Sequence, residues 1–326
     1  MNSDKPLVSV FMITYNHEKY IAQAIESALM QKTDFNYEIV IGEDCSTDRT
    51  REIVVDYANR YPEIIKPILH ENNVGAKANS ESVRKACIGK YVAILEGDDY
   101  WIDPLKLQKQ VDFMESHPDF SMCCHAVSRV NVEGRDLKKP IMPYPEDCIV
   151  PTEDVVAAGG GFVGTNSILY RKEFMDNPPE FYRISPVGDA ALLLNLAIQG
   201  NVYYSPDIMS AYRTGATGSW TFSINSSRKK RADLNLAMIK MLKLFDNYTC
   251  YKYTRSVDTI KLKHEFDLYL TMRQFHILRE DRYRDYVGTL GKFFIWKSRL
   301  KLKFPLMVRC VRKLKSQWAR LLRGFS

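Results

Sequence analysis

Residues 7–16 read LVSVFMITYN, and this stretch decides the fold class. It opens with a nearly continuous apolar run, Leu7–Ile13, rich in residues that favour β-strands. The polar residues Thr14, Tyr15 and Asn16 follow directly. A short run of this kind is typical of a strand that is covered on both faces of a parallel sheet. The sequence therefore predicts a buried first strand with a polar turn at its carboxyl end.

Predicted strands and helices alternate after this segment. Between the strands, apolar residues recur at helical spacing, with Ser46-Thr47-Asp48 and Asp103-Pro104 as helix-start signals. This alternation favours an α/β fold with a mostly parallel central sheet flanked by helices. The predicted strands are 7–13, 37–41, 64–69 and 91–95.

The rest of the chain is less regular. Here we expect a loop at 140–151, a strand at 162–170, a helix at 188–199, and short strands at 202–204 and 208–212. From about residue 226 onward the chain is predicted to be helical and basic. The prediction is one domain over residues 1–225 and a helical C-terminal region over residues 226–326.

Polar clusters follow three of the predicted strands: Thr14-Tyr15-Asn16, Glu43-Asp44 and Glu96-Gly97-Asp98-Asp99. Ligands bind beyond the carboxyl ends of parallel strands, so these clusters should meet at one edge of the sheet. Neighbouring carboxylates repel unless a cation offsets them, and Mg²⁺ or Mn²⁺ prefers oxygen ligands. The clusters therefore predict a site for a divalent cation and a diphosphate. The simpler alternative is that the Asp pair caps the turn that follows it.

Four motifs, in this order, resemble those of family 2 glycosyltransferases: Val8–Asn16, Glu43–Asp48, Asn73-Val74-Gly75 with Asn79, and Gly89–Trp101. The second is similar to the family's D-D-G-S-T-D element and the fourth to its metal-binding D-x-D segment. The resemblance covers residues 7–115. It implies the GT-A fold and an inverting enzyme of the kind that builds bacterial cell-surface polysaccharides.

The resemblance also implies roles for individual residues. Tyr15 would stack on the nucleotide base, Asp44 would bond its edge and Glu96 would hold the ribose. Asp98 would bind the metal, Mg²⁺ or Mn²⁺, and Lys77 would reach the phosphates. The full nucleotide-sugar-binding set is Thr14, Tyr15, Asn16, Glu18, Asp44, Lys77, Glu96, Asp98 and Arg213.

The chain departs from the family pattern at several positions. Glu43 and Glu96 stand where the family usually has Asp. Cys45 replaces Gly, which suggests a turn without a positive φ angle. Arg213 lies where the family often has a nearby His, and it could take over a charge role.

Transfer of a sugar from a sugar diphosphate to an acceptor hydroxyl needs a base that takes the proton of the hydroxyl. In the family this base is an acidic residue at the start of a helix, after a region that resembles Gly164–Ser167 here. Asp189 is the matching residue and the candidate catalytic base. A helix N-cap is the alternative role for its carboxylate.

Several other classes are disfavoured. The seven cysteines form no C-x-x-C pair, which argues against zinc and disulfides and favours a reduced cytoplasmic location. The six histidines form no ligand pattern, and Gly159-Gly160-Gly161 lacks the context of a nucleotide-binding loop. We expect neither a signal peptide nor a membrane-spanning segment.

The C-terminal segment is strongly basic. The net charge is +7, and no acidic residue follows Asp285. An apolar stripe at helical spacing predicts an amphipathic helix lying on an anionic membrane surface. The alternative is a stripe that packs on the enzyme's own core, while nucleic acid is disfavoured because no aromatic stacking platform accompanies the charges. The stripe consists of Phe304, Met307, Val311, Leu314, Trp318 and Leu321.

Together these patterns predict an enzyme that moves a sugar from a nucleoside diphosphate sugar, UDP-linked, to a saccharide or lipid-linked acceptor. It would work at the cytoplasmic face of the membrane. A sugar nucleotidyltransferase is disfavoured, because no Gly-rich basic loop follows the first strand. The alternative from another class is a non-catalytic nucleotide-sugar or membrane-docking protein on the same fold.

Overall fold

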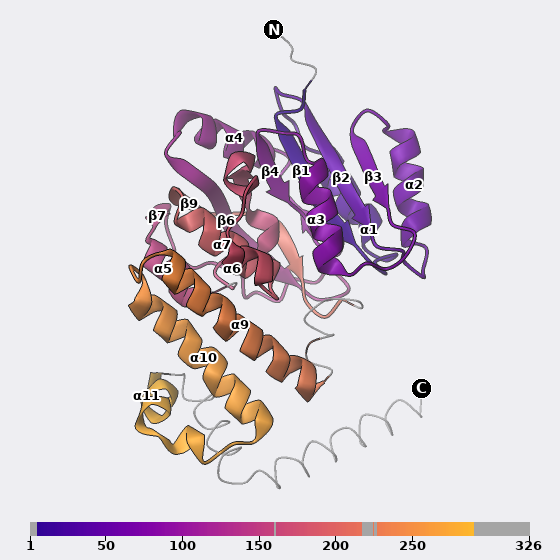
Figure 1. Cartoon of the computed structure of the whole chain (residues 1–326). Coiled ribbons are helices and arrows are strands. Elements are labelled where there is room, and N and C mark those ends of the chain that lie inside the picture. The colour runs from indigo at the N-terminus through magenta and orange to yellow at the C-terminus, as the bar shows by residue number, and fades with distance from the viewer. Residues whose placement is uncertain (1–4, 160, 217–223, 225–226, 290–326) are drawn as a thin grey trace.

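The structure is a computed structural model and is described for residues 5–159, 161–216, 224 and 227–289. A nine-stranded sheet runs through the larger part of the molecule, with helices on both faces (Figure 1). Its strands follow the order β3-β2-β1-β4-β8-β6-β9-β5, and β7 also pairs with β9.

The first half of the sheet is parallel, as predicted. It consists of β1 (Val8–Thr14), β2 (Tyr37–Glu43), β3 (Ile65–Leu69) and β4 (Tyr91–Ile94). Side chains of β1 and β2 that alternate along the strands are fully buried against the first helices. The helices of this half are α1 (Ile21–Leu29), α2 (Thr50–Arg60), α3 (Ala76–Ala86) and α4 (Lys106–Ser116).

The second half of the sheet is mixed. It contains β5 (Tyr100–Trp101), β6 (Phe120–Val130), β7 (Cys148–Val150), β8 (Leu169–Arg171) and β9 (Asn201–Arg213). Strand β8 is antiparallel to both β4 and β6, and β9 is parallel to β6. Strands β6 and β9 therefore run in the same direction as β1, and the carboxyl ends of β1, β2, β4, β6 and β9 lie at one edge, called the site edge below.

Three predictions for the middle of the chain are wrong in detail. The expected strand 162–170 is a 3₁₀ turn, η1 (Thr165–Ser167), followed by β8, because the Ser167 hydroxyl donates to the Gly164 carbonyl at 2.6 Å and closes the turn. The two short strands expected at 202–204 and 208–212 form the single strand β9, which follows β6 through register shifts. Strand β7 lies inside the expected loop 140–151.

The remaining helices lie toward the C-terminus of the described chain. They are α5 (Thr152–Ala158), η2 (Lys172–Met175), α6 (Glu180–Ile184), α7 (Gly188–Ala197), α9 (Arg228–Tyr248), α10 (Thr254–Met272), η3 (Ile277–Arg279) and α11 (Asp281–Thr289). Helices α9 and α10 share an apolar core with α6 and α7 through residues such as Phe181, Leu194 and Phe245. The helical region is therefore packed onto the sheet domain, and the boundary at residue 225 stays a prediction.

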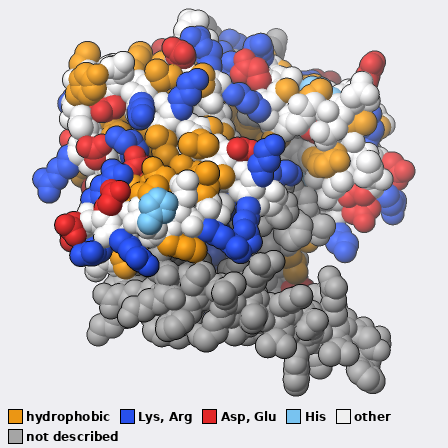
Figure 2. All heavy atoms as spheres, turned by 60° about the horizontal axis from the view of Figure 1, so that its bottom comes forward, with side chains coloured by type: hydrophobic (Ala, Val, Ile, Leu, Met, Phe, Trp, Pro, Cys, Tyr) orange, Lys and Arg blue, Asp and Glu red, His pale blue; other side chains and the backbone are white. Residues whose placement is uncertain are grey.

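The surface of the described chain is of mixed character. Large apolar side chains such as Leu236 and Met272 are exposed on the C-terminal helices. On the face shown in Figure 2, apolar side chains gather in one area with Lys and Arg side chains around it. Of the helices in the described ranges, none combines the length and apolar character needed to cross a bilayer. The predicted amphipathic segment, with its stripe at 304–321, lies outside the described residues.

Candidate functional site

The loop after β1 is tied to the loop after β2. Asn16 adopts a left-handed conformation with φ of 55°, its backbone N–H donates to the Ser46 hydroxyl at 2.9 Å, and its Oδ1 accepts from Thr47 N at 2.8 Å. Glu18 Oε2 accepts from Arg49 N at 3.2 Å, at the start of α2. The predicted donor-binding residues Asn16 and Glu18 thus hold the two loops together, which favours a role in shaping the site.

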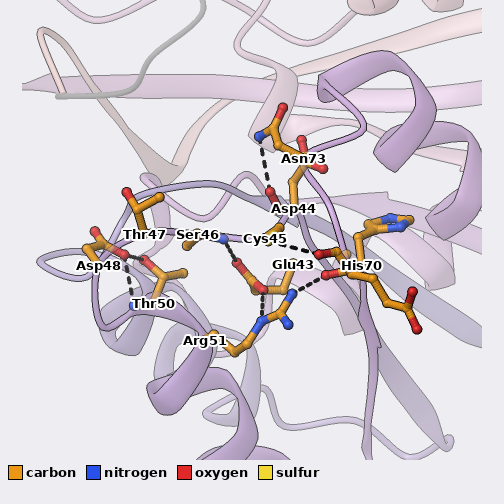
Figure 3. A network of polar contacts seen from close by, with 12 residues as sticks. Glu43, Asp44, Cys45, Ser46, Thr47, Asp48, Thr50, Arg51, His70 and Asn73 are labelled. Carbon is orange, nitrogen blue, oxygen red and sulfur yellow. Dashed lines mark hydrogen bonds and ion pairs between the residues drawn. The ribbon is translucent and has the colours of Figure 1, made fainter.

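Glu43 and Asp44 at the end of β2 are both buried and both hydrogen-bonded (Figure 3). Glu43 accepts from Ser46 N at 2.7 Å and forms an ion pair with Arg51 at 2.5 Å. Asp44 Oδ1 accepts from Val74 N at 2.7 Å and Oδ2 from Gly75 N at 3.0 Å. Because each carboxylate oxygen has a second lone pair, Asp44 is held in place and can still accept from a ligand.

The prediction for Cys45 is wrong. Its φ angle is 55°, so the turn does require the left-handed conformation that the usual glycine adopts freely. Such a conformation costs a non-glycine residue about 1 kcal/mol. The Cys45 thiol lies 3.3 Å from the Glu71 carbonyl, a contact that helps to hold the turn (Figure 3).

Three carboxylates gather in the loop between β4 and β5. Burial, together with the charges of Asp98 and Asp189, raises the pKa of Glu96 to about 8. Glu96 Oε2 is buried and has no hydrogen-bond partner. Burial likewise raises the pKa of Asp99 well above its ordinary value, with added effects of Asp98 and Glu96. These carboxylates are therefore crowded together, and positive charge would stabilise their ionised forms.

Asp189 comes from a distant part of the chain to the same place. It is the second residue of α7, whose N-cap is Val187, and its Oδ1 accepts from Ala190 N at 2.7 Å. Burial raises its pKa to about 6. The structure therefore does not make Asp189 the N-cap itself, although its carboxylate does accept one amide hydrogen of the first turn.

Lys77 and Arg213 are both engaged by protein acceptors. Lys77 Nζ donates to the backbone carbonyls of Arg183 at 2.6 Å and Ser185 at 3.4 Å, just before α7. This arrangement indicates that Lys77 positions the turn that contains Asp189. It argues against the predicted contact between Lys77 and the phosphates.

Arg213 is buried at the end of β9. Its Nε donates to the Asp98 carbonyl at 2.9 Å and its Nη2 to Gln23 Oε1 at 2.7 Å, while Nη1 donates to the carbonyls of Asn131 and Val132. The guanidinium therefore fixes the backbone at Asp98. This structural role differs from the predicted one, in which the charge of Arg213 would act directly on the nucleotide sugar.

The donor set fits a divalent cation that is shared with a diphosphate. Within the described ranges, no three His, Cys, Asp or Glu side chains form a complete metal cage. Mg²⁺ typically needs only one or two carboxylates when phosphates supply further oxygens. The unpartnered Glu96 oxygen beside Asp98 and Asp189 shows a region short of positive charge, and Asp98 is the residue that would hold the ion.

Two residues of η1 were not predicted individually. The Thr165 hydroxyl interacts with the carboxylates of both Glu96 and Asp189. Asn166 is fully buried, and its amide donates to Asp99 Oδ2 at 2.9 Å. The segment Gly164–Ser167 had been noted in the sequence, but its role depends on contacts with residues far away in the chain. His17 was interpreted as non-ligating; it is buried, and its Nε2 has no hydrogen-bond partner.

A sequence model for glycosyl transferase family 2 matches residues 9–176, which span the donor side of this site and η1. The chain belongs to glycosyltransferase family 2. Its residues Asp44, Glu96 and Asp98 lie at the ends of the strands to which the family motifs were assigned.

Two relatives are similar to the chain in sequence. It is 37% identical over 225 residues to an uncharacterized protein of Mycobacterium tuberculosis, covering 68% of this chain and 63% of the relative. It is 31% identical over 128 residues to a chondroitin synthase of Escherichia coli, covering 39% of this chain and 18% of the synthase. The chain thus spans less than two thirds of the length of either relative.

Solved structures show the same fold. TarS of S. aureus, in a crystal structure with UDP-GlcNAc, superposes with a TM-score of 0.61 at 19% identity, covering 86% of this chain and 79% of that one. This likeness confirms the predicted GT-A fold of the family, with its helical C-terminal region.

Proposed function

We propose that this chain is a glycosyltransferase that moves a sugar from a nucleoside diphosphate sugar, UDP-linked, to an acceptor hydroxyl with inversion. The observation that carries the proposal is the meeting of Asp189 from α7 with Glu96 and Asp98 from the β4–β5 loop. A base and a metal-binding carboxylate at one sheet edge are the two groups that such a transfer needs.

Asp189 is the base in this reaction. A carboxylate with a pKa of about 6 is mostly ionised at neutral pH and is a better proton acceptor than an ordinary aspartate. It takes the proton of the acceptor hydroxyl while the oxygen attacks the anomeric carbon and the bond to the diphosphate breaks. A single displacement of this kind inverts the anomeric configuration.

Asp98 would hold a divalent cation, Mg²⁺ or Mn²⁺, through its carboxylate. When bound, the cation supplies positive charge for the leaving diphosphate. The chain's own contribution is to hold Asp98 in place through Arg213, which bonds the Asp98 carbonyl. Asp44, fixed by Val74 and Gly75, accepts from the base edge of the nucleotide, and Tyr15 stacks on its face.

Polysaccharide or lipid-linked oligosaccharide assembly is the pathway that we infer. The likeness to a chondroitin synthase supports a saccharide acceptor. We also infer peripheral attachment at the cytoplasmic face of the membrane through residues 300–326. The basic, acid-free sequence after Asp285 supports this attachment, and so does the apolar area bordered by Lys and Arg (Figure 2). Liposome co-sedimentation with and without residues 300–326 tests it, and equal binding of both chains would contradict it.

A panel of nucleotide sugars with Mn²⁺ tests the activity. The expected result is slow hydrolysis of one donor, faster when its acceptor is added, and no hydrolysis after chelation of the metal. Nucleotide binding without turnover of any donor, in the presence of acceptor glycans, would favour the non-catalytic alternative.

A further inference from the structure

Asn166 lies at the centre of a buried network at the site edge. Its side chain is fully buried, and its amide nitrogen donates to Asp99 Oδ2 at 2.9 Å and to the Ala211 carbonyl at 3.0 Å. Its Oδ1 accepts from the Ser210 hydroxyl at 2.9 Å, and its backbone carbonyl accepts from Trp101 Nε1 at 2.9 Å. Both amide hydrogens and the amide oxygen therefore have partners, as a buried amide requires.

On the donor side, this network fixes the loop that contains Asp98. The next residue, Asp99, accepts from Asn166 through one oxygen and from Arg213 N, at 2.8 Å, through the other. Strand β5 then pairs with β9 directly after it, at Tyr100 and Trp101. Asp98 is thus held between the end of β4 and a short segment that is anchored to β9.

On the acceptor side, the same turn contacts the base. Thr165 precedes Asn166 in η1, and its hydroxyl interacts with the carboxylates of Glu96 and Asp189. A displacement of Asn166 therefore changes two separations at once: that between η1 and the Asp98 loop, and that between Thr165 and the base.

We propose that Asn166 is a positioning residue for sugar transfer, one that sets the distance between the metal-binding loop and the base. This inference rests on the function proposed above. Packing alone would not require an amide, because an apolar side chain fills a buried position without the desolvation cost. Alanine at this position would leave Asp99, itself buried, without one of its two donors.

The test compares Asn166→Ala with Asn195→Ala. Asn195 in α7 is equally buried and donates to the Phe174 carbonyl at 2.9 Å, away from the Asp98 loop, so it is a matched control. The probes are calorimetric binding of UDP with MnCl₂, and kcat and KM for donor hydrolysis, all well below the melting temperatures. We expect Asn166→Ala to weaken Mn²⁺-dependent UDP binding and to lower kcat, each by roughly tenfold or more. Asn195→Ala should lower only the melting temperature.

Ser210→Ala gives a second measurement if Asn166→Ala does not fold. It removes only the hydroxyl that holds the Asn166 oxygen, so we expect smaller losses in the same direction. Unchanged UDP binding and kcat in a folded Asn166→Ala, or in Ser210→Ala when the first variant is unfolded, would overturn the positioning role. Equal losses in Asn195→Ala would overturn it too. A wild-type chain that neither binds UDP with Mn²⁺ nor turns over any nucleotide sugar overturns the proposed function instead, and this inference falls with it.

Discussion

Replacing Asp189 by Asn should remove the base while leaving the fold intact. The amide oxygen of Asn can still accept the hydrogen bond from Ala190 N, which measures 2.7 Å in the wild type. Its basicity is gone, so we expect kcat to fall by roughly 10²-fold or more while donor affinity is retained.

The pH profile gives the magnitude for the wild type. With a pKa raised by burial to about 6, Asp189 is about one tenth ionised at pH 5 and about nine tenths ionised at pH 7, so kcat/KM should rise roughly tenfold across this interval. The base form is present above the pKa and is lost as the pH falls through it. Release of nucleoside diphosphate from the donor, followed from pH 5 to pH 8, measures both effects.

Asp154→Asn is the matched control. Asp154 lies in the first turn of α5, away from the site, and its carboxylate accepts from the Tyr144 hydroxyl at 2.5 Å. We expect this variant to keep the wild-type kcat and pH profile. A folded Asp189→Asn protein with kcat within threefold of the wild type, or a flat wild-type profile between pH 5 and pH 7, would refute the assignment of the base.

Three further predictions concern other residues. Asp98→Ala should abolish turnover and the rise in melting temperature that Mn²⁺ and nucleotide produce together; thermal melts with and without the metal check this, and a retained rise would contradict the metal assignment. Lys77→Met should lower kcat more than it raises the donor KM, because the ammonium group holds the turn before α7 rather than the donor; a change in KM alone would favour a phosphate contact. Lys106 is fully buried and its pKa is lowered by burial to about 7 from 10.5, so its charge destabilises the fold below pH 7 and less so as the pH rises toward 10.5. Wild type should therefore gain about 2 kcal/mol relative to Lys106→Met between pH 7 and pH 9; urea unfolding measures this, with exposed Lys109→Met as the control, and parallel pH curves for wild type and Lys106→Met would argue against a buried charge.

The parallel half of the sheet was predictable because its signals are local. Runs such as 7–13 and 91–95 are short, apolar and followed by polar turns. A run with this pattern is typical of a strand that is buried on both faces of a parallel sheet. The positions of Asp44, Asp98 and Asp189 followed from motif order. By contrast, β6 was missed, because FSMCCHAVSRV mixes polar and apolar residues without a clear period. Its partners β8 and β9 are far away in the chain.

The contacts that hold the site residues in place were not predictable either, because their partners are also far apart in the chain. Lys77 reaches Arg183 across 106 positions, and no pattern within a motif indicates where a flexible cation will find its acceptors. The left-handed Cys45 turn shows the opposite case. There a φ angle that favours glycine occurs at a cysteine, because Glu43 and Asp44 on its N-terminal side are fixed by buried hydrogen bonds.

The bond between Asp99 and the Arg213 backbone joins residues 114 positions apart, and this separation has a consequence for synthesis. A ribosome adds about 5–20 residues each second, so the nascent chain exposes Asp98 roughly ten seconds before the strand that anchors its loop has been made. The early fragment already contains every donor-side motif, yet it lacks both Asn166 and β9. On the proposed function, a growing chain should therefore bind metal and nucleotide tightly only after translation has passed Arg213.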